Sequence, residues 1–221
     1  MGTQRDRLPE ALLAAASDRQ GGATEVARRA LDGLLEIAGD RALLVAAVEV
    51  LVEGQPAMAP VWHLARAARG EEPAAALAAL RESLDRDAEG AAEAAAAWLR
   101  RYGHGAVATV SHSSLVDMVL ERLPRPERAG AAATPEVAVI GADAIGPDAL
   151  LNATGTSALV DQLPTLVVST PVKLVPAAVF ARLAAPGFEV VPLEVLAAVA
   201  LGAELMSPAD AGRLAAGLEG G

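Results

Sequence analysis

The chain has 221 residues, of which 53% are hydrophobic but only 2% aromatic, and its formal net charge is −10. An acidic protein is a poor partner for nucleic acid, where Lys and Arg must neutralise phosphates, and for an anionic membrane surface. The absence of cysteine excludes disulfides, thiolate metal sites and a cysteine nucleophile.

No cofactor or targeting signal is expected. The three histidines, His63, His104 and His112, are too widely spaced for a metal-ligand pattern, so we predict neither a metal nor another cofactor. The N-terminus lacks the apolar core of a signal peptide. The apolar segments 43–52 and 190–206 are interrupted by glutamates and are too short to span a bilayer. We therefore expect a soluble, cytoplasmic protein.

The first hundred residues are predicted to be mostly helical, because alanine and leucine recur there with helical spacing. The pattern predicts helices over residues 9–16, 24–38, 41–53, 58–68 and 73–102. The last of these is expected to break near Gly90, because glycine is a poor helix former.

After residue 104 the pattern alternates between strands and helices. Residues 106–110 and 137–140 are short apolar runs typical of buried parallel strands, and 115–123 has helical spacing, so the three predict a right-handed βαβ unit. Further strands are predicted at 165–168 and 190–191, and helices at 156–162, 176–183, 193–200 and 208–218.

These elements predict an α/β fold with a helical N-terminal region (1–103) and a domain with a parallel sheet (104–221). Open α/β sheets bind ligands outside the carboxyl ends of their strands. A Gly-Ala-Asp turn follows the second strand directly, so Asp143 is expected at the rim of the sheet. With Asn152 and Thr156 nearby, it would form a polar cluster at a ligand crevice.

Several stretches, in the same order along the chain, resemble one protein family. They are 21–28 (Gly-Gly-Ala-Thr-Glu-Val-Ala-Arg), 55–60 (Gln-Pro-Ala-Met-Ala-Pro), 109–114 (Thr-Val-Ser-His-Ser-Ser), 141–145 (Gly-Ala-Asp-Ala-Ile), then Asn152, Gly155, Thr156, Lys173 and 188–192 (Phe-Glu-Val-Val-Pro). The family contains the alpha, beta and delta subunits of eukaryotic translation initiation factor 2B, methylthioribose-1-phosphate isomerase and archaeal ribose-1,5-bisphosphate isomerase. The Gly-Ala-Asp-Ala-Ile block is the most specific part of this resemblance.

The resemblance implies a helical N-terminal region packed on a reduced Rossmann-like parallel sheet domain, and assembly into a homodimer or larger homo-oligomer. It also implies catalytic candidates. In the family's isomerases, a cysteine in the first polar turn and an aspartate in the Gly-Ala-Asp turn move protons between neighbouring sugar carbons. Asp143 matches that aspartate, and Ser111 stands where the cysteine would be. A cysteine reaches the thiolate state near neutral pH, whereas a serine hydroxyl needs a neighbouring base. His112 is adjacent, but neighbours in a turn often point apart.

A phosphorylated small molecule is the ligand that the resemblance implies. The residues predicted to bind it are Gly22, Ala23, Thr24, Ser113, Ser114, Asn152, Gly155, Thr156 and Lys173. The two serines precede a helix, whose free amides attract an anion, although capping of that helix is a compatible role for them. Asp143 could likewise cap its own turn, and Lys173 could be a solvated loop lysine.

Other positions depart from the family. Gly21 lies where the bisphosphate isomerases carry a phosphate-binding arginine, Gln55 where a second arginine is expected, and Ala153 where a lysine follows the asparagine. Losing these cations removes much of the affinity for a bisphosphate. The family also has a further strand–helix–strand segment between its two polar turns, whereas residues 115–136 leave room for one crossover.

Two functions remain open. The missing cysteine, the lost basic residues and the shortened sheet favour a non-catalytic or weakly active initiation-factor-2B-like protein that binds a sugar phosphate or nucleotide and assembles with itself. The alternative is a sugar-phosphate aldose–ketose isomerase, an intramolecular oxidoreductase resembling ribose-1,5-bisphosphate isomerase, which would use Asp143 without the family cysteine. The sequence does not decide whether the chain is an enzyme.

Overall fold

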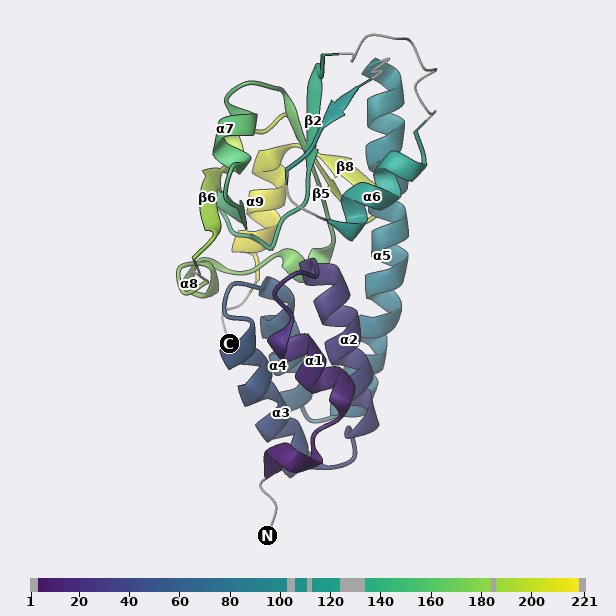
Figure 1. Cartoon of the computed structure of the whole chain (residues 1–221), viewed down its shortest axis with the longest axis vertical. Coiled ribbons are helices and arrows are strands. Elements are labelled where there is room, and N and C mark those ends of the chain that lie inside the picture. The colour runs from purple at the N-terminus through teal and green to yellow at the C-terminus, as the bar shows by residue number, and fades with distance from the viewer. Residues whose placement is uncertain (1–3, 103–105, 111–112, 124–133, 184–185, 219–221) are drawn as a thin grey trace.

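The first half of the chain is a bundle of helices (Figure 1). The computed structural model describes residues 4–102, 106–110, 113–123, 134–183 and 186–218. The bundle consists of η1 (Gln4–Arg7), α1 (Glu10–Ser17), α2 (Ala23–Glu36), α3 (Arg41–Gly54), α4 (Ala59–Arg69) and α5 (Pro73–Tyr102). All five helices predicted from the apolar spacing are therefore present. Their leucines form one core, in which Leu12, Leu34 and Leu44 are fully buried.

Helix α5 is continuous, so the predicted break near Gly90 is wrong. A β-carbon at Gly90 would lie 2.9 Å from the backbone of Ala203, so glycine there permits a close approach between the helix and the sheet. The helix is about 45 Å long at the usual rise per residue. Leu77 and Leu84 belong to the core of the bundle, whereas Leu99 and the alanines before it pack on the sheet (Figure 1). One helix thus serves both halves of the molecule.

The main sheet has the strand order β1-β2-β5-β7-β8, in which β1, β2, β5 and β7 are parallel and β8 is antiparallel. Its elements are β1 (Val107–Ala108), β2 (Val137–Ile140), β5 (Thr165–Ser169), β7 (Ala198–Leu201) and β8 (Glu204–Met206). Helix α6 (Ser114–Glu121) connects β1 to β2, so the predicted βαβ unit is confirmed. With the bundle, this sheet gives the α/β fold expected from the sequence.

Strand β7 corrects the helix predicted over residues 193–200. The structure has a short 3-10 helix, η3 (Leu193–Val195), followed directly by this strand. All four residues of β7 are buried, and Val199 pairs with Val167 on one side and Met206 on the other. Alanine favours a helix, but burial between two neighbouring strands overrides that intrinsic preference.

A second, antiparallel sheet was not predicted. It has the order β3-β4-β6 and consists of β3 (Ala144–Ile145), β4 (Ala149–Ala153) and β6 (Phe188–Pro192). The predicted strand at 190–191 therefore exists, but in this second sheet. The remaining elements are α7 (Thr156–Val160), η2 (Pro171–Lys173), α8 (Ala177–Phe180) and α9 (Pro208–Ala216). Within the described residues, no helix is long and apolar enough to cross a membrane.

Candidate functional site

A crevice of about 490 Å³ lies between the helical bundle and the turn that follows β2. Its walls come from the turn before α2, the end of α3 with the turn after it, and the second sheet. The lining residues are Asp18, Arg19, Gln20, Gly21, Gly22, Glu53, Gly54, Gln55, Pro56, Ala57, Met58, Asp143, Ala153, Pro186 and Phe188. Its size suits a sugar or a small nucleotide.

Asp143 is fixed in the crevice by its own backbone. Its N–H donates to the carbonyl of Leu151 at 2.9 Å, and its carbonyl accepts the N–H of Ala59 at 3.1 Å. The first bond ties the turn to the second sheet, and the second satisfies a free amide at the start of α4. The backbone therefore holds the Asp143 carboxylate at the point where bundle and sheet meet.

Lys173 is the charged partner of Asp143. It is 3% exposed and ends η2, beside the point where Ile145 and Leu174 form a bridge. Burial raises the pKa of the Asp143 carboxyl, and the positive charge of Lys173 partly offsets this. Burial likewise lowers the pKa of Lys173, and the charge of Asp143 opposes the change. An acid with a raised pKa beside a base with a lowered pKa is suited to proton transfer as well as to ligand binding.

His63 of α4 holds the segment that carries Lys173. Its Nε2 lies 2.8 Å from the carbonyl oxygen of Leu174. Because a carbonyl only accepts, Nε2 carries the proton and donates. Burial lowers the pKa of His63, and the charge of Arg66 adds to this, so the ring favours its neutral form. His63 is thus a structural link between bundle and sheet.

Asn152 and Thr156, which were predicted to form a polar cluster with Asp143, bond to one another and, among the described residues, not to Asp143. Asn152 Nδ2 donates to Thr156 Oγ1 at 3.0 Å, and that hydroxyl donates to the carbonyl of Ala153 at 2.7 Å. The two side chains are 3% and 0% exposed. Gly155 lies between them with a φ of 101°, a conformation that favours glycine. The cluster shapes the turn beside Ala153, which does line the crevice.

The other predicted ligand residues are distributed around the crevice. Gly22 lines it, whereas Ala23 and Thr24 begin α2 and are buried; the Thr24 hydroxyl has no hydrogen-bond partner in the described structure. Ser113 precedes α6 and packs against Gly141, and Ser114 is the first residue of α6. Ser111 and His112 lie outside the described residues.

The sequence pattern does not single out Asp18, Arg19 and Glu53, which also line the crevice. The carboxylate of Asp18 is held by backbone amides: its Oδ1 accepts the N–H groups of Gln20 and Gly21, each at 2.8 Å. Such an Asp before a glycine pair is typical of an Asx turn, which is the signal that could have identified it. Its Oδ2 also accepts a hydrogen bond from Arg29 of α2 at 2.8 Å, which ties the turn to that helix.

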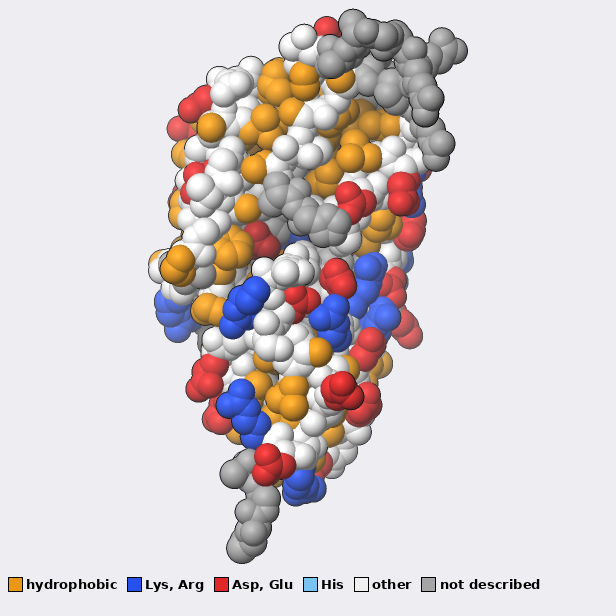
Figure 2. Space-filling model, in the orientation of Figure 1, with side chains coloured by type: hydrophobic (Ala, Val, Ile, Leu, Met, Phe, Trp, Pro, Cys, Tyr) orange, Lys and Arg blue, Asp and Glu red, His pale blue; other side chains and the backbone are white. Residues whose placement is uncertain are grey.

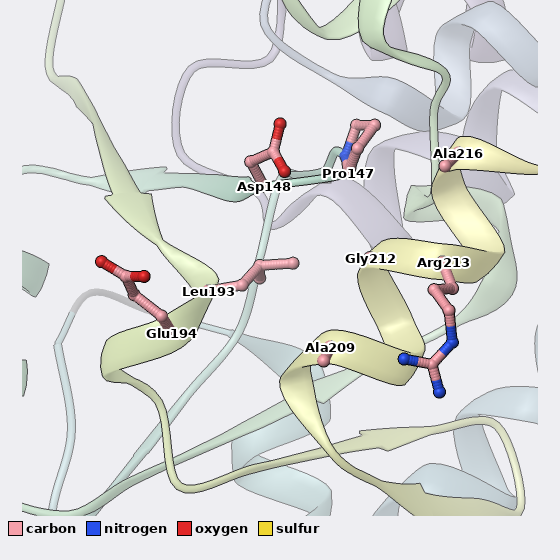
Figure 3. Close-up of a pocket in the computed structure, with 8 residues that line it drawn as sticks. All are labelled: Pro147, Asp148, Leu193, Glu194, Ala209, Gly212, Arg213 and Ala216. Atoms are coloured by element: carbon pink, nitrogen blue, oxygen red, sulfur yellow. The ribbon is translucent and has the colours of Figure 1, made fainter.

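A second cavity, of about 430 Å³, lies between α9, η3 and the turn after β3 (Figure 3). The charged ends of Asp148, Glu194 and Arg213 point away from one another there. None of the residues predicted to form the site lines this cavity. Among the described residues there is also no group of three or more His, Asp or Glu side chains arranged to hold a metal ion.

Comparisons with models of protein families and with curated protein sequences give no match. Solved structures with the same fold include a translation initiation factor eIF-2B of Pyrococcus horikoshii OT3, 17% identical, with a TM-score of 0.69 over 91% of this chain and 98% of that one. The eIF2B beta of Chaetomium thermophilum is 13% identical, with a TM-score of 0.62 over 96% and 90%.

The 5-methylthioribose 1-phosphate isomerase of Pyrococcus horikoshii OT3 is similar as well. It is 16% identical, with a TM-score of 0.58 over 96% of this chain and 91% of that one. Nearly the whole chain therefore has the fold of these proteins, as the resemblance in its sequence predicted. At such low identity the likeness extends to the fold and not to the activity.

Proposed function

We propose that this chain, which has the fold of initiation factor 2B subunits and of a methylthioribose-1-phosphate isomerase, binds a sugar-like small molecule without converting it and assembles with itself. The ligand predicted from the sequence, a sugar phosphate or a nucleotide, contains a polyol that suits this crevice. A cytoplasmic location stays a prediction from the sequence.

The observation that carries the proposal is the Asp143 carboxylate on the wall of the crevice. No residue that the structure describes makes a hydrogen bond to it, while its backbone is fixed on both sides. A carboxylate held in this way is ready to accept hydrogen bonds from sugar hydroxyls, and such charge-assisted bonds are strong. The apolar side chains of Met58 and Phe188 on the same walls suit the carbon face of a sugar ring.

Isomerisation needs a second proton-transfer group besides Asp143. A thiol cannot serve as that group, because the chain contains no cysteine. Lys173 is coupled to Asp143 but does not line the crevice. The arrangement therefore supports binding better than isomerisation. The raised pKa of Asp143 is the one observation that favours the alternative, an aldose–ketose isomerase in which this carboxyl moves the proton.

Phosphorus NMR separates the two functions. The wild-type protein is incubated with ribose 1,5-bisphosphate and, separately, with 5-methylthioribose 1-phosphate. We expect no ketose product from either compound. Product formed by the wild type and abolished in Asp143→Asn would establish the isomerase and refute the binding-only function.

Self-assembly is proposed from the surface. Figure 2 shows hydrophobic side chains gathered over the half that carries the sheet, whereas charged side chains of both signs cover the helical half. Exposed apolar side chains there include Leu120 of α6 at 38% and Val190 of β6 at 57%. Apolar side chains gathered on an exposed face are typical of an interface. Light scattering after gel filtration should give the mass of a homodimer or larger assembly, and a monomer would contradict this part of the proposal.

A further inference from the structure

The carboxylate of Asp18 fills the anion position at the start of α2. Its Oδ1 accepts the N–H groups of Gln20 and Gly21, and its Oδ2 accepts Arg29 at 2.8 Å. Two backbone amides and a guanidinium are the donors that a bound phosphate would need. The amides of Gly21 and Gln20 hold the pKa of Asp18 below its usual value, so the group stays charged at neutral pH.

This internal anion occupies the space beside Gly21. A β-carbon at Gly21 would lie 2.6 Å from Asp18 Oδ2, so the carboxylate packs directly against the backbone of that glycine. Gln55 Nε2 donates to the carbonyl of Asp18 at 2.7 Å and ties this turn to the end of α3. A ligand phosphate near Gly21 would therefore meet a like charge at close range.

Two other side-chain donors on the walls, Gln55 and Arg19, are also in use. Gln55 Nε2 gives its second hydrogen to the carbonyl of Ala15 at 2.8 Å. Arg19, the one cation among the described residues that line the crevice, donates to the carbonyls of Ala16 at 3.2 Å and Gly54 at 2.9 Å. These bonds tie the ends of α1 and α3 together. The crevice thus offers an incoming anion no free cationic side chain of the described structure.

The charged groups left to a ligand are carboxylates. Asp143 and Glu53 line the crevice, and neither carboxylate has a hydrogen-bond partner among the described residues. Asp143 is the more buried of the two, since Glu53 is exposed at the mouth. Carboxylates recognise hydroxyl and ammonium groups, which donate hydrogen bonds to them.

We infer that the crevice selects a ligand without a phosphate group, an uncharged or cationic sugar, because Asp18 serves as a built-in anion. This inference rests on the proposed function, namely that the crevice binds a sugar-like molecule. It sets the ligand apart from the phosphorylated class expected from the sequence.

Calorimetric titration with three probes tests the inference: ribose, ribose 5-phosphate and inorganic phosphate. The wild type should bind ribose and should bind ribose 5-phosphate about tenfold more weakly, because one like charge at close range costs at least that much. Asp18→Ala frees the two amides and Arg29, so it should gain binding of inorganic phosphate. Asp32→Ala is the matched control, since Asp32 also pairs with an arginine, Arg81, but away from the crevice.

The possible results of these titrations distinguish the inference about Asp18 from the proposed sugar binding. Tighter binding of ribose 5-phosphate than of ribose by the wild type would overturn the inference. So would an Asp18→Ala protein that is folded by circular dichroism yet gains no phosphate binding. If Asp18→Ala fails to fold, Asp18→Asn removes the charge, keeps the shape and should raise the affinity for ribose 5-phosphate. Failure of the wild type to bind any probe, with phosphate binding gained in Asp18→Ala, would refute the proposed function but support the role of Asp18.

Discussion

The half-buried Asp143 and the buried Lys173 form a pair of opposite charges at the junction of the two halves, and each acts on the pKa of the other. Asp143 comes from the turn after β2, and Lys173 from η2, which follows β5. Because β2 and β5 are adjacent parallel strands, the segments after their carboxyl ends meet at one edge of the sheet. The two charges therefore come close together only when these two strands are paired in the folded sheet.

Loss of one partner should destabilise the protein more than loss of both. We expect Lys173→Met to lower the free energy of unfolding by about 2 kcal/mol, because it leaves the Asp143 carboxylate buried without an opposite charge. Adding Asp143→Asn should restore most of that loss. Urea unfolding of the two single variants and the double variant measures the coupling, and additive effects would contradict it. Exposed Arg213→Met is the control and should change stability by less than about 0.5 kcal/mol.

Stability should fall with pH below neutrality because of His63. The pKa of this ring is lowered from 6.5 in the folded protein, so the unfolded chain takes up the proton first. The stabilisation is complete above 6.5 and is lost as the pH falls towards the lower folded value. Urea midpoints between about pH 7.5 and 5 should therefore decline more in the wild type than in His63→Gln, which keeps a donor for Leu174. Parallel declines in the two proteins would contradict this role.

The close approach at Gly90 should make an alanine there unfavourable. Alanine normally stabilises an exposed helical position by about 1 kcal/mol relative to glycine. Here its β-carbon would lie 2.9 Å from the backbone of Ala203, so we expect Gly90→Ala to lower stability by about 1–3 kcal/mol. Gly39 has no atom within 4 Å of an added β-carbon, and Gly39→Ala should be nearly neutral in thermal unfolding. A stabilising Gly90→Ala would show that α5 does not contact the sheet in this way.

The two halves should unfold together, because α5 contributes to the cores of both. The two tryptophans report on two different contacts between the halves. Trp62 of α4 packs against a cluster that includes Ala144 and Leu151 of the second sheet, and Trp98 lies on the part of α5 that packs on the main sheet. In Trp62→Phe and Trp98→Phe, the remaining tryptophan should give the same fluorescence midpoint in urea as circular dichroism. Two well-separated midpoints within one variant would contradict a single cooperative unit.

Much of this fold can be predicted from residue patterns. Helical spacing identifies the bundle, and the apolar runs around α6 identify the βαβ unit, because burial imposes these periods directly. Strand β7 cannot be predicted in this way, since its alanine-rich residues favour a helix and only its place between β5 and β8 makes them a strand. The helix break predicted at Gly90 is wrong for a similar reason, because the close contact with Ala203 cannot be recognised in the local sequence.

In the candidate site, too, local patterns can be predicted from the sequence, whereas contacts between distant segments cannot. Asp143 could be predicted because it directly follows a recognisable buried strand. The internal bond between Asn152 and Thr156 could not, since it depends on side-chain directions. The role of Asp18 was also hidden, because its partners Gly21 and Arg29 become an anion-binding arrangement only when the turn and α2 are folded.

The most direct test of the binding function is a calorimetric titration of ribose into the wild type and into Asp143→Asn, both shown to be folded. We predict saturable binding to the wild type. The affinity of Asp143→Asn should be lower by a factor of at least about ten, because the variant loses a charge-assisted hydrogen bond. Equal affinity in the two proteins, or no binding to the wild type, would contradict the proposal that Asp143 holds a sugar in this crevice.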